Sequence, residues 1–176
     1  MRIISGEFGG RIISPPSNFK ARPTTDFAKE NLFNVLNNRL DYEECDVLDL
    51  FGGTGGIGYE FASRGAKQVT TIEMDFHHSR FIEETIKKLK IENMKVVKTN
   101  VFVFIKRFKA TWDVVFADPP YALEGIDELP NLIFEKKLLN EGGLFIFEHS
   151  KDKDYSSHPH FKEKRTYGSV NFSFFQ

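Results

Sequence analysis

The chain has 176 residues, of which 40% are hydrophobic and 14% aromatic, which is enough for one well-packed domain and too little for a large multidomain protein. No apolar run approaches the roughly 18 residues of a membrane span, and the first residues lack the apolar centre of a signal peptide. The single cysteine, Cys45, has no partner for a disulfide and no companion at metal-ligand spacing. We therefore expect a cytoplasmic protein with no membrane segment and no metal. We also expect a monomer, although the sequence itself leaves the oligomeric state open.

The net charge of −1 is unevenly distributed along the chain. Residues 1–40 carry six Lys/Arg and three Asp/Glu, residues 41–149 carry 13 and 19, and residues 150–176 carry five and three. An acidic body between basic ends fits a cationic small molecule in the body and nucleic-acid phosphates at the ends. An ordinary solvated surface explains the same pattern equally well.

The N-terminal segment differs in pattern from the rest of the chain. Two isoleucine pairs on either side of Gly9-Gly10 predict two short strands around a turn. The cluster Thr24 to Asp26 offers helix-capping oxygens, and the apolar spacing that follows predicts a helix to about Leu40. We divide the chain into a basic β-hairpin extension, residues 1–22, and a main domain, residues 23–176.

The main domain alternates short β-rich runs with helical patterns. Strands are predicted in the runs 47–51, 69–72, 96–97, 114–117 and 144–147, and helices near 57–64, 76–90, 101–108 and 127–139. This alternation predicts a parallel sheet with helices on both faces. The last two runs, 162–167 and 170–175, predict an antiparallel hairpin. The fold class is α/β with a Rossmann-like sheet.

A glycine-rich stretch, Phe51 to Gly58, lies between the first predicted strand and helix and contains the spacing Gly53-x-Gly55-x-x-Gly58. Such glycines let the backbone turn tightly and a ligand approach closely, while the helix start offers free amides. Glu73 lies 20 residues after Gly53, at the end of the second predicted strand, where a carboxylate can bind ribose hydroxyls. The combination predicts a nucleotide with an unphosphorylated ribose, although a plain tight turn remains the alternative.

Asp49 indicates which nucleotide this is. It precedes the glycines, where a dinucleotide would place its pyrophosphate, and the like charges would repel by about 1 kcal/mol in water and by more when water is excluded. S-adenosylmethionine carries an ammonium and a sulfonium and no phosphate, so Asp49 favours it. The Gly-Lys-Ser/Thr ending of a nucleoside triphosphatase is absent. We predict S-adenosylmethionine as the cofactor and keep an NAD-dependent oxidoreductase as a less favoured alternative.

The fourth predicted strand ends in an acid, two prolines and an aromatic ring, Asp118 to Tyr121. Proline keeps the chain extended and has no N–H, so the carbonyls of Asp118 and Pro119 should stay free beside the carboxylate. These acceptors suit the two N–H bonds of an aromatic amine, on which the ring can stack. Asp49, Glu73 and Asp118 end three strands of one sheet, which places them in one crevice. We predict methyl transfer to the amine, with Asp118 taking the proton that nitrogen loses.

At these residues the chain resembles a known family. The motifs are Asp118-Pro-Pro-Tyr121, the glycine loop, Ile72-Glu-Met-Asp75, Arg22-Pro-Thr-Thr-Asp26 and the opening Met1-Arg-Ile-Ile-Ser-Gly6. Together they are similar to the bacterial methyltransferases that modify guanine N2 in small-subunit (16S) ribosomal RNA, at guanine 966. The Asp-Pro-Pro-Tyr motif alone also marks enzymes that methylate adenine or cytosine. An N6-adenine or N4-cytosine DNA methyltransferase therefore stays an alternative, as does an RNA-binding module with a decayed site.

The resemblance implies a seven-stranded sheet whose last strand is antiparallel, and ribosomal RNA within the small subunit as the partner. It implies that the catalytic residues are Asp118, Pro119, Pro120 and Tyr121. It implies that the cofactor is held by Asp49, Phe51, Gly52, Gly53, Gly55, Glu73, Met74, Asn100, Val101 and Thr24. The candidate RNA phosphate contacts are Arg2, Arg11, Lys20 and Arg22. Relatives often carry arginine at the positions of Phe27 and Lys29, so we expect RNA affinity or its salt dependence to differ here.

Overall fold

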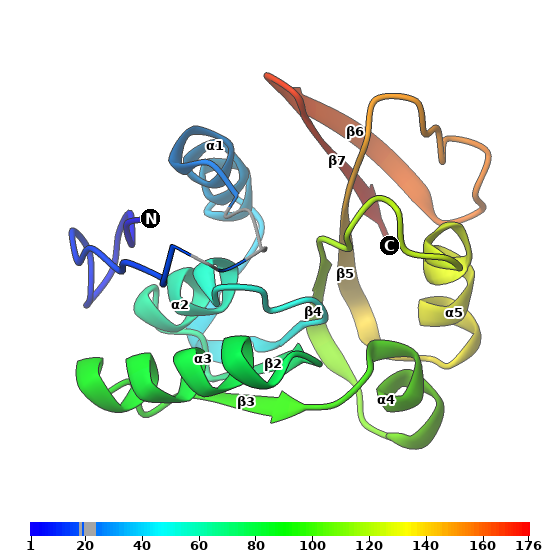
Figure 1. The fold of residues 1–176 in the computed structure, drawn as a ribbon. Coiled ribbons are helices and arrows are strands. Elements are labelled where there is room, and N and C mark those ends of the chain that lie inside the picture. The colour runs from blue at the N-terminus through cyan, green and yellow to red at the C-terminus, as the bar shows by residue number, and fades with distance from the viewer. Residues whose placement is uncertain (18, 20–23) are drawn as a thin grey trace.

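Seven strands form one sheet in the computed structural model, which describes residues 1–17, 19 and 24–176 (Figure 1). The strands are β1 (Asp46–Asp49), β2 (Gln68–Glu73), β3 (Met94–Lys98), β4 (Trp112–Ala117), β5 (Leu139–His149), β6 (Phe161–Tyr167) and β7 (Val170–Phe175). Their order is β3-β2-β1-β4-β5-β7-β6. Strands β1 to β5 are parallel to one another, and β7 is antiparallel to both β5 and β6. This confirms the predicted sheet with an antiparallel last strand.

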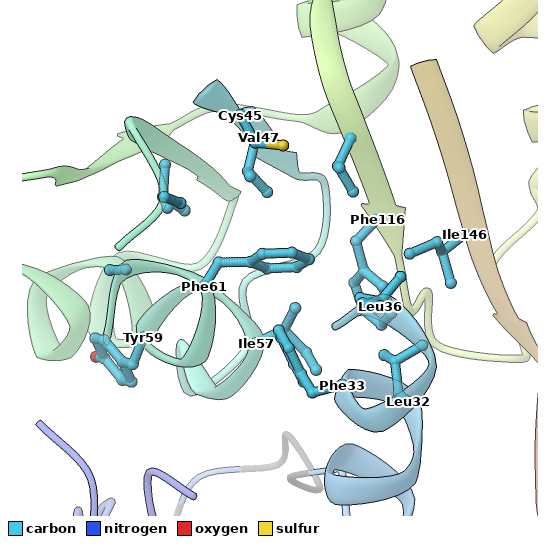
Figure 2. Close-up of a cluster of buried hydrophobic side chains, with 14 of the residues drawn as sticks. Leu32, Phe33, Leu36, Cys45, Val47, Ile57, Tyr59, Phe61, Phe116 and Ile146 are labelled. Carbon is cyan, nitrogen blue, oxygen red and sulfur yellow. The ribbon is translucent and has the colours of Figure 1, made fainter. Parts of the chain in front are cut away.

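Helices cover both faces of the sheet. They are α1 (Asp26–Leu36), α2 (Gly56–Ser63), α3 (Phe76–Leu89), α4 (Val101–Arg107) and α5 (Leu129–Glu135), with short 3-10 turns at Tyr42–Glu44 and Ile126–Glu128. Residues of α1, α2 and α3 pack in a first core, which Figure 2 shows in close-up, and residues of α4 and α5 pack in a second core on the opposite face. Within the described residues, no helix is long and apolar enough to cross a membrane.

Alternation along the strands explains the two cores. In β4, Val114 and Phe116 pack in the first core, while Val115 and Ala117 pack in the second. Successive side chains of a strand point to opposite faces, so a parallel strand covered on both faces is apolar throughout. The same alternation decides which face each residue at a strand end points to.

The helix predicted near 127–139 is shorter than expected. The structure has a helix only to Glu135, and β5 begins at Leu139 instead of near 144. The helix ends in a Schellman arrangement, in which the amide of Leu138 donates to the carbonyl of Ile133 (3.1 Å) and the amide of Lys137 donates to that of Phe134 (3.0 Å). Lys137 takes the left-handed conformation (φ 52) that this ending requires. No glycine marks the position, so the apolar pattern alone overextended the helix.

The N-terminal segment is tied to α1 and α2 by a buried charge network. The segment forms one antiparallel bridge, Arg2 to Ile12, in place of the two predicted strands. Glu60 of α2 is fully buried and accepts hydrogen bonds from the amides of Ile4 (2.7 Å) and Ser5 (3.1 Å). The buried Lys29 lies 3.6 Å from the same carboxylate. The segment is therefore anchored through Glu60, and the boundary proposed between residues 22 and 23 lies outside the described residues.

We expect Glu60→Ala to lower the free energy of unfolding by about 3–5 kcal/mol, because it leaves the Lys29 ammonium buried without its partner. Burial already lowers the pKa of Lys29, and the charge of Glu60 opposes that shift. Glu84→Ala is the matched control, since Glu84 pairs with Arg80 (2.8 Å) on an exposed face of α3 and should contribute less than about 1 kcal/mol. Urea unfolding followed by circular dichroism measures both. Equal losses in the two variants would contradict the anchoring role.

Candidate active site

The carboxyl ends of the parallel strands carry acids that point to one side of the sheet. Asp49 comes two residues after Val47 in β1, and Asp118 comes two residues after Phe116 of β4. Val47 and Phe116 both pack in the first core, so the two acids lie on that face, at the edge where the strands end. The charges of Asp118 and Glu73 both act on Asp49. The structure therefore brings together the three acids that the sequence placed in one crevice.

Asp49 is the most deeply buried of the three. Its residue is 1% exposed, and neither carboxylate oxygen has a hydrogen-bond partner among the described residues. Burial, followed by the charges of Asp118 and Glu73, raises the pKa of Asp49 to about 7, and the nearby amide of Phe51 and hydroxyl of Thr71 oppose this shift. A buried carboxylate without a hydrogen bond of ordinary geometry is unfavourable unless a ligand supplies donors. Asp49 is therefore poised to bind a cation or an N–H group.

Glu73 shapes the glycine loop. The amide of Gly53 donates to Glu73 Oε2 (2.7 Å), and the amide of Asp75 donates to Oε1 (2.7 Å). Gly53 and Gly55 take positive φ values of 52 and 84. A Cβ on Gly55 would lie 2.5 Å from Cζ of Tyr59, so this glycine is required by the close approach of the ring. The turn of the loop is therefore stabilised by the hydrogen bond to Glu73 of β2 and by the packing of Gly55 against Tyr59 of α2.

Two further glycines explain how closely the loop and α2 approach the sheet. A Cβ on Gly52 would lie 2.4 Å from the Thr71 methyl carbon, and one on Gly58 would lie 2.5 Å from Cε of Met94. A side chain at either position would push the backbone away from β2 and β3. The glycine spacing therefore has a packing role. It also means that no side chains of the loop cover its backbone.

The residues after β4 present the predicted acceptors. Among the described residues, no backbone amide outside the regular ladders donates to the carbonyls of Asp118 and Pro119. Burial raises the pKa of Asp118 to about 7, and the nearby hydroxyl of Thr24 opposes the shift. Pro119 is buried, Pro120 is exposed, and the ring of Tyr121 is 49% exposed. A half-exposed ring thus lies next to a carboxylate and two free carbonyls.

Glu148 of β5 is a fourth acid at this edge, which the sequence interpretation did not assign to the site. Ala117 pairs with Phe147 in the parallel register of β4 and β5, so Asp118 and Glu148 are the next neighbours across the two strands. Glu148 is 5% exposed, and its Oε2 has no hydrogen-bond partner among the described residues. Burial, then the charge of Asp118, raises the pKa of Glu148 to about 9. Its place two residues after Ile146, a residue of the first core, was the signal that could have found it.

The residues assigned to the adenine end of the cofactor are close together at the start of α4. The side chain of Asn100 accepts from the amides of Phe102 (2.9 Å) and Val103 (3.2 Å) and so caps the helix, and its amide nitrogen lies 3.5 Å from the sulfur of Met74. Met74 is 63% exposed, whereas Val101 is buried in the second core. Met74 therefore offers an accessible apolar surface beside the acids, and Phe51 of the loop is half-buried against the second core.

Of the four basic residues assigned to RNA, the structure describes Arg2 and Arg11. Arg2 is exposed and lies 3.9 Å from Asp26, whereas Arg11 lines a surface hollow with Lys88 and Lys90. Lys20 and Arg22 lie outside the described residues. The side chain of Lys29 is buried against Glu60, so it does not offer a surface charge to RNA. Phe27, by contrast, is 62% exposed.

Comparison with known proteins agrees with this geometry. A family model described as Conserved hypothetical protein 95 matches residues 1–176. The Ribosomal RNA small subunit methyltransferase D of Escherichia coli (strain K12) is 35% identical over 148 residues, covering 84% of this chain and 74% of that protein. The Haemophilus influenzae protein of the same name is 33% identical over 183 aligned positions, covering 100% of this chain and 93% of that protein.

A solved structure, a putative methyltransferase yhhF from Escherichia coli, superimposes with a TM-score of 0.87 at 30% identity and covers 100% of this chain and 97% of that one. These findings confirm both the family resemblance and the Rossmann-like methyltransferase fold that were inferred from the motifs. Because the family model matches the chain from end to end, the protein belongs to the Conserved hypothetical protein 95 family of methyltransferases.

Proposed function

We propose that this protein transfers a methyl group from S-adenosylmethionine to the exocyclic N2 amine of guanine 966 in small-subunit ribosomal RNA. The observation that carries the proposal is the cluster of Asp49, Glu73, Asp118 and Glu148 at the carboxyl ends of the strands. In this cluster Asp49 and Glu148 are buried, and carboxylate oxygens of both lack a hydrogen bond among the described residues. Such a site suits a ligand that brings positive charge on one side and N–H donors on the other. The names of the relatives support ribosomal RNA of the small subunit as the substrate.

The residues around Asp49 fit the cofactor. S-adenosylmethionine, when bound, supplies a methyl group on a sulfonium, whose transfer to nitrogen leaves S-adenosylhomocysteine. The unpartnered carboxylate of Asp49 suits its cationic amino acid end, and the uncovered glycine loop allows close approach of its backbone amides. Glu73 remains an acceptor for ribose hydroxyls beside the amides that it already binds. A dinucleotide fits less well, because its pyrophosphate would meet the acids at short range.

Asp118 and its neighbours fit the target amine. The carboxylate and the free carbonyls can accept both N–H bonds of N2, which orients the nitrogen toward the methyl group. Holding the two reactants aligned is itself worth on the order of 7 kcal/mol at best. The half-exposed Tyr121 can stack on the base. After transfer, the nitrogen carries one proton too many, and Asp118 is positioned to take it.

The affinity for S-adenosylmethionine should depend on pH through Asp49. The carboxyl has a pKa of about 7 in the free protein, and a cationic ligand favours its ionised form. Affinity should therefore rise about fivefold between about pH 6 and 7, and it should fall again above about pH 8, where the α-amino group of the ligand loses its proton. Isothermal titration calorimetry measures this rise, which Asp49→Asn should abolish and the exposed Asp41→Asn should preserve. An equal rise in the Asp49 variant would refute the assignment.

We expect Asp118→Ala to lower the rate of methyl transfer by about 100-fold or more while S-adenosylmethionine still binds, because the variant loses the amine acceptor and proton acceptor. Labelled methyl incorporation into undermethylated small ribosomal subunits measures the rate, and digestion of the product identifies the base and position. Duplex DNA serves as the competing substrate. Incorporation into DNA adenine or cytosine in place of ribosomal guanine would replace the proposed function with a DNA methyltransferase.

Arg11 provides a test of the RNA surface. Arg11→Ala should weaken binding to small-subunit RNA and lower the slope of log affinity against log salt by about one, as expected for one lost phosphate contact. Filter binding at several salt concentrations measures the slope. Lys67→Ala is the control, since Lys67 lies 3.9 Å from Asp46 at the start of β1. An unchanged slope for Arg11→Ala would show that RNA does not reach this hollow.

A further inference from the structure

We propose that Glu148 is a specificity-determining residue, whose carboxylate accepts a hydrogen bond from the ring N1–H of the target guanine beside the N2 amine held by Asp118. This inference rests on the proposed function and adds to it a reason why guanine is chosen over other amino-bearing bases. It gives a role to a buried acid that neither the fold nor the cofactor accounts for.

The position of Glu148 places it beside the target amine. The pairing of Ala117 with Phe147 makes Asp118 and Glu148 neighbours across two parallel strands, which lie about 4.8 Å apart in a sheet. The charge of Asp118 acts on Glu148, and the charges of both acids act on Tyr121. Asp118, Glu148 and the ring that can stack on the base therefore lie together at this edge of the sheet.

The fold does not use the Glu148 carboxylate. On its other side, β7 places the fully buried Phe172 opposite Glu148, and a phenyl ring has no polar hydrogen to donate. The side chain is 5% exposed, Oε2 has no partner, and none of the ion pairs between described residues includes Glu148. A buried acceptor in this state is unfavourable until a donor arrives. A ligand N–H is the missing donor.

The chemistry of the bases selects guanine. Next to its exocyclic amine, guanine has a ring N1–H, which is a donor, whereas adenine and cytosine have a ring nitrogen with a lone pair, which is an acceptor. Two neighbouring carboxylates thus match the two adjacent donors of guanine. Against adenine or cytosine, Glu148 would face a second acceptor. In the free protein burial raises the pKa of Glu148 to about 9, and an N1–H donor favours the ionised form that burial opposes.

The test compares guanine with 2-aminopurine, which keeps the 2-amino group and has an acceptor at ring N1. Small subunits are assembled with ribosomal RNA that carries one or the other base at the target position. The rate of methylation of each substrate is then measured for the wild type, Glu148→Gln and Glu141→Gln. Glu141 is an exposed acid on the same strand and serves as the matched control. The wild type and the control should methylate guanine about 100-fold faster than 2-aminopurine or more. In Glu148→Gln this ratio should fall about tenfold, because a neutral amide accepts more weakly and can itself donate to N1.

Each outcome decides between a recognition role and its alternatives. If Glu148→Gln slows both substrates equally, the residue is structural, and if it leaves both rates unchanged, the residue does not contact the base. A wild type that methylates both bases equally overturns this inference and leaves the proposed function intact. A wild type that methylates neither overturns the proposed function, and this inference with it. Thermal unfolding checks that the glutamine variant is folded, since it replaces an unpartnered carboxylate by a group of the same shape.

Discussion

The crowding of four carboxylates at one edge of the sheet is the constraint on which the site depends. Strand alternation turns Asp49, Asp118 and Glu148 to the same face, and burial raises their pKa values to about 7, 7 and 9, with neighbouring acids adding to the shift at Asp49 and Glu148. Glu73 relieves part of its own charge by binding two backbone amides. Asp49, Asp118 and Glu148 can still accept hydrogen bonds from a ligand. The site is therefore unfavourable by itself and becomes favourable when cations and N–H donors enter.

Two buried acids of the same protein show the difference between structure and function. Glu60 is as buried as Asp49, yet it accepts from two backbone amides and pairs with Lys29 and Arg64. Its charge is neutralised within the chain, so it fixes the N-terminal segment to α1 and α2. Asp49 has no such partners among the described residues. A buried charge that is satisfied stabilises a fold, whereas one that is left unsatisfied identifies a binding site.

Sequence patterns predicted the sheet, most of its helices and the three acids at the strand ends, because periodicity and glycine spacing are local properties. They failed where a residue's environment is set by distant segments. Nothing in the local sequence indicates that Lys29 is buried, since its partner Glu60 comes from another helix. The helix after Ile126 is shorter than predicted because Lys137 takes the left-handed conformation that ends it, which a lysine does not indicate in the sequence. Glu148 was missed because its sequence signal, the alternation with Ile146, does not show that the acid is buried without a partner.

The sequence by itself determined the α/β class, the glycine loop, the Asp118-Pro-Pro-Tyr121 motif and the family, since each depends on residue type and spacing along the chain. Only the tertiary structure decided which side chains share the crevice and which lack a partner. Asp118 and Glu148 are 30 residues apart in sequence, and the register of β4 with β5 makes them neighbours. Burial, partner and pKa depend on such contacts between remote segments, so they follow from the folded chain alone.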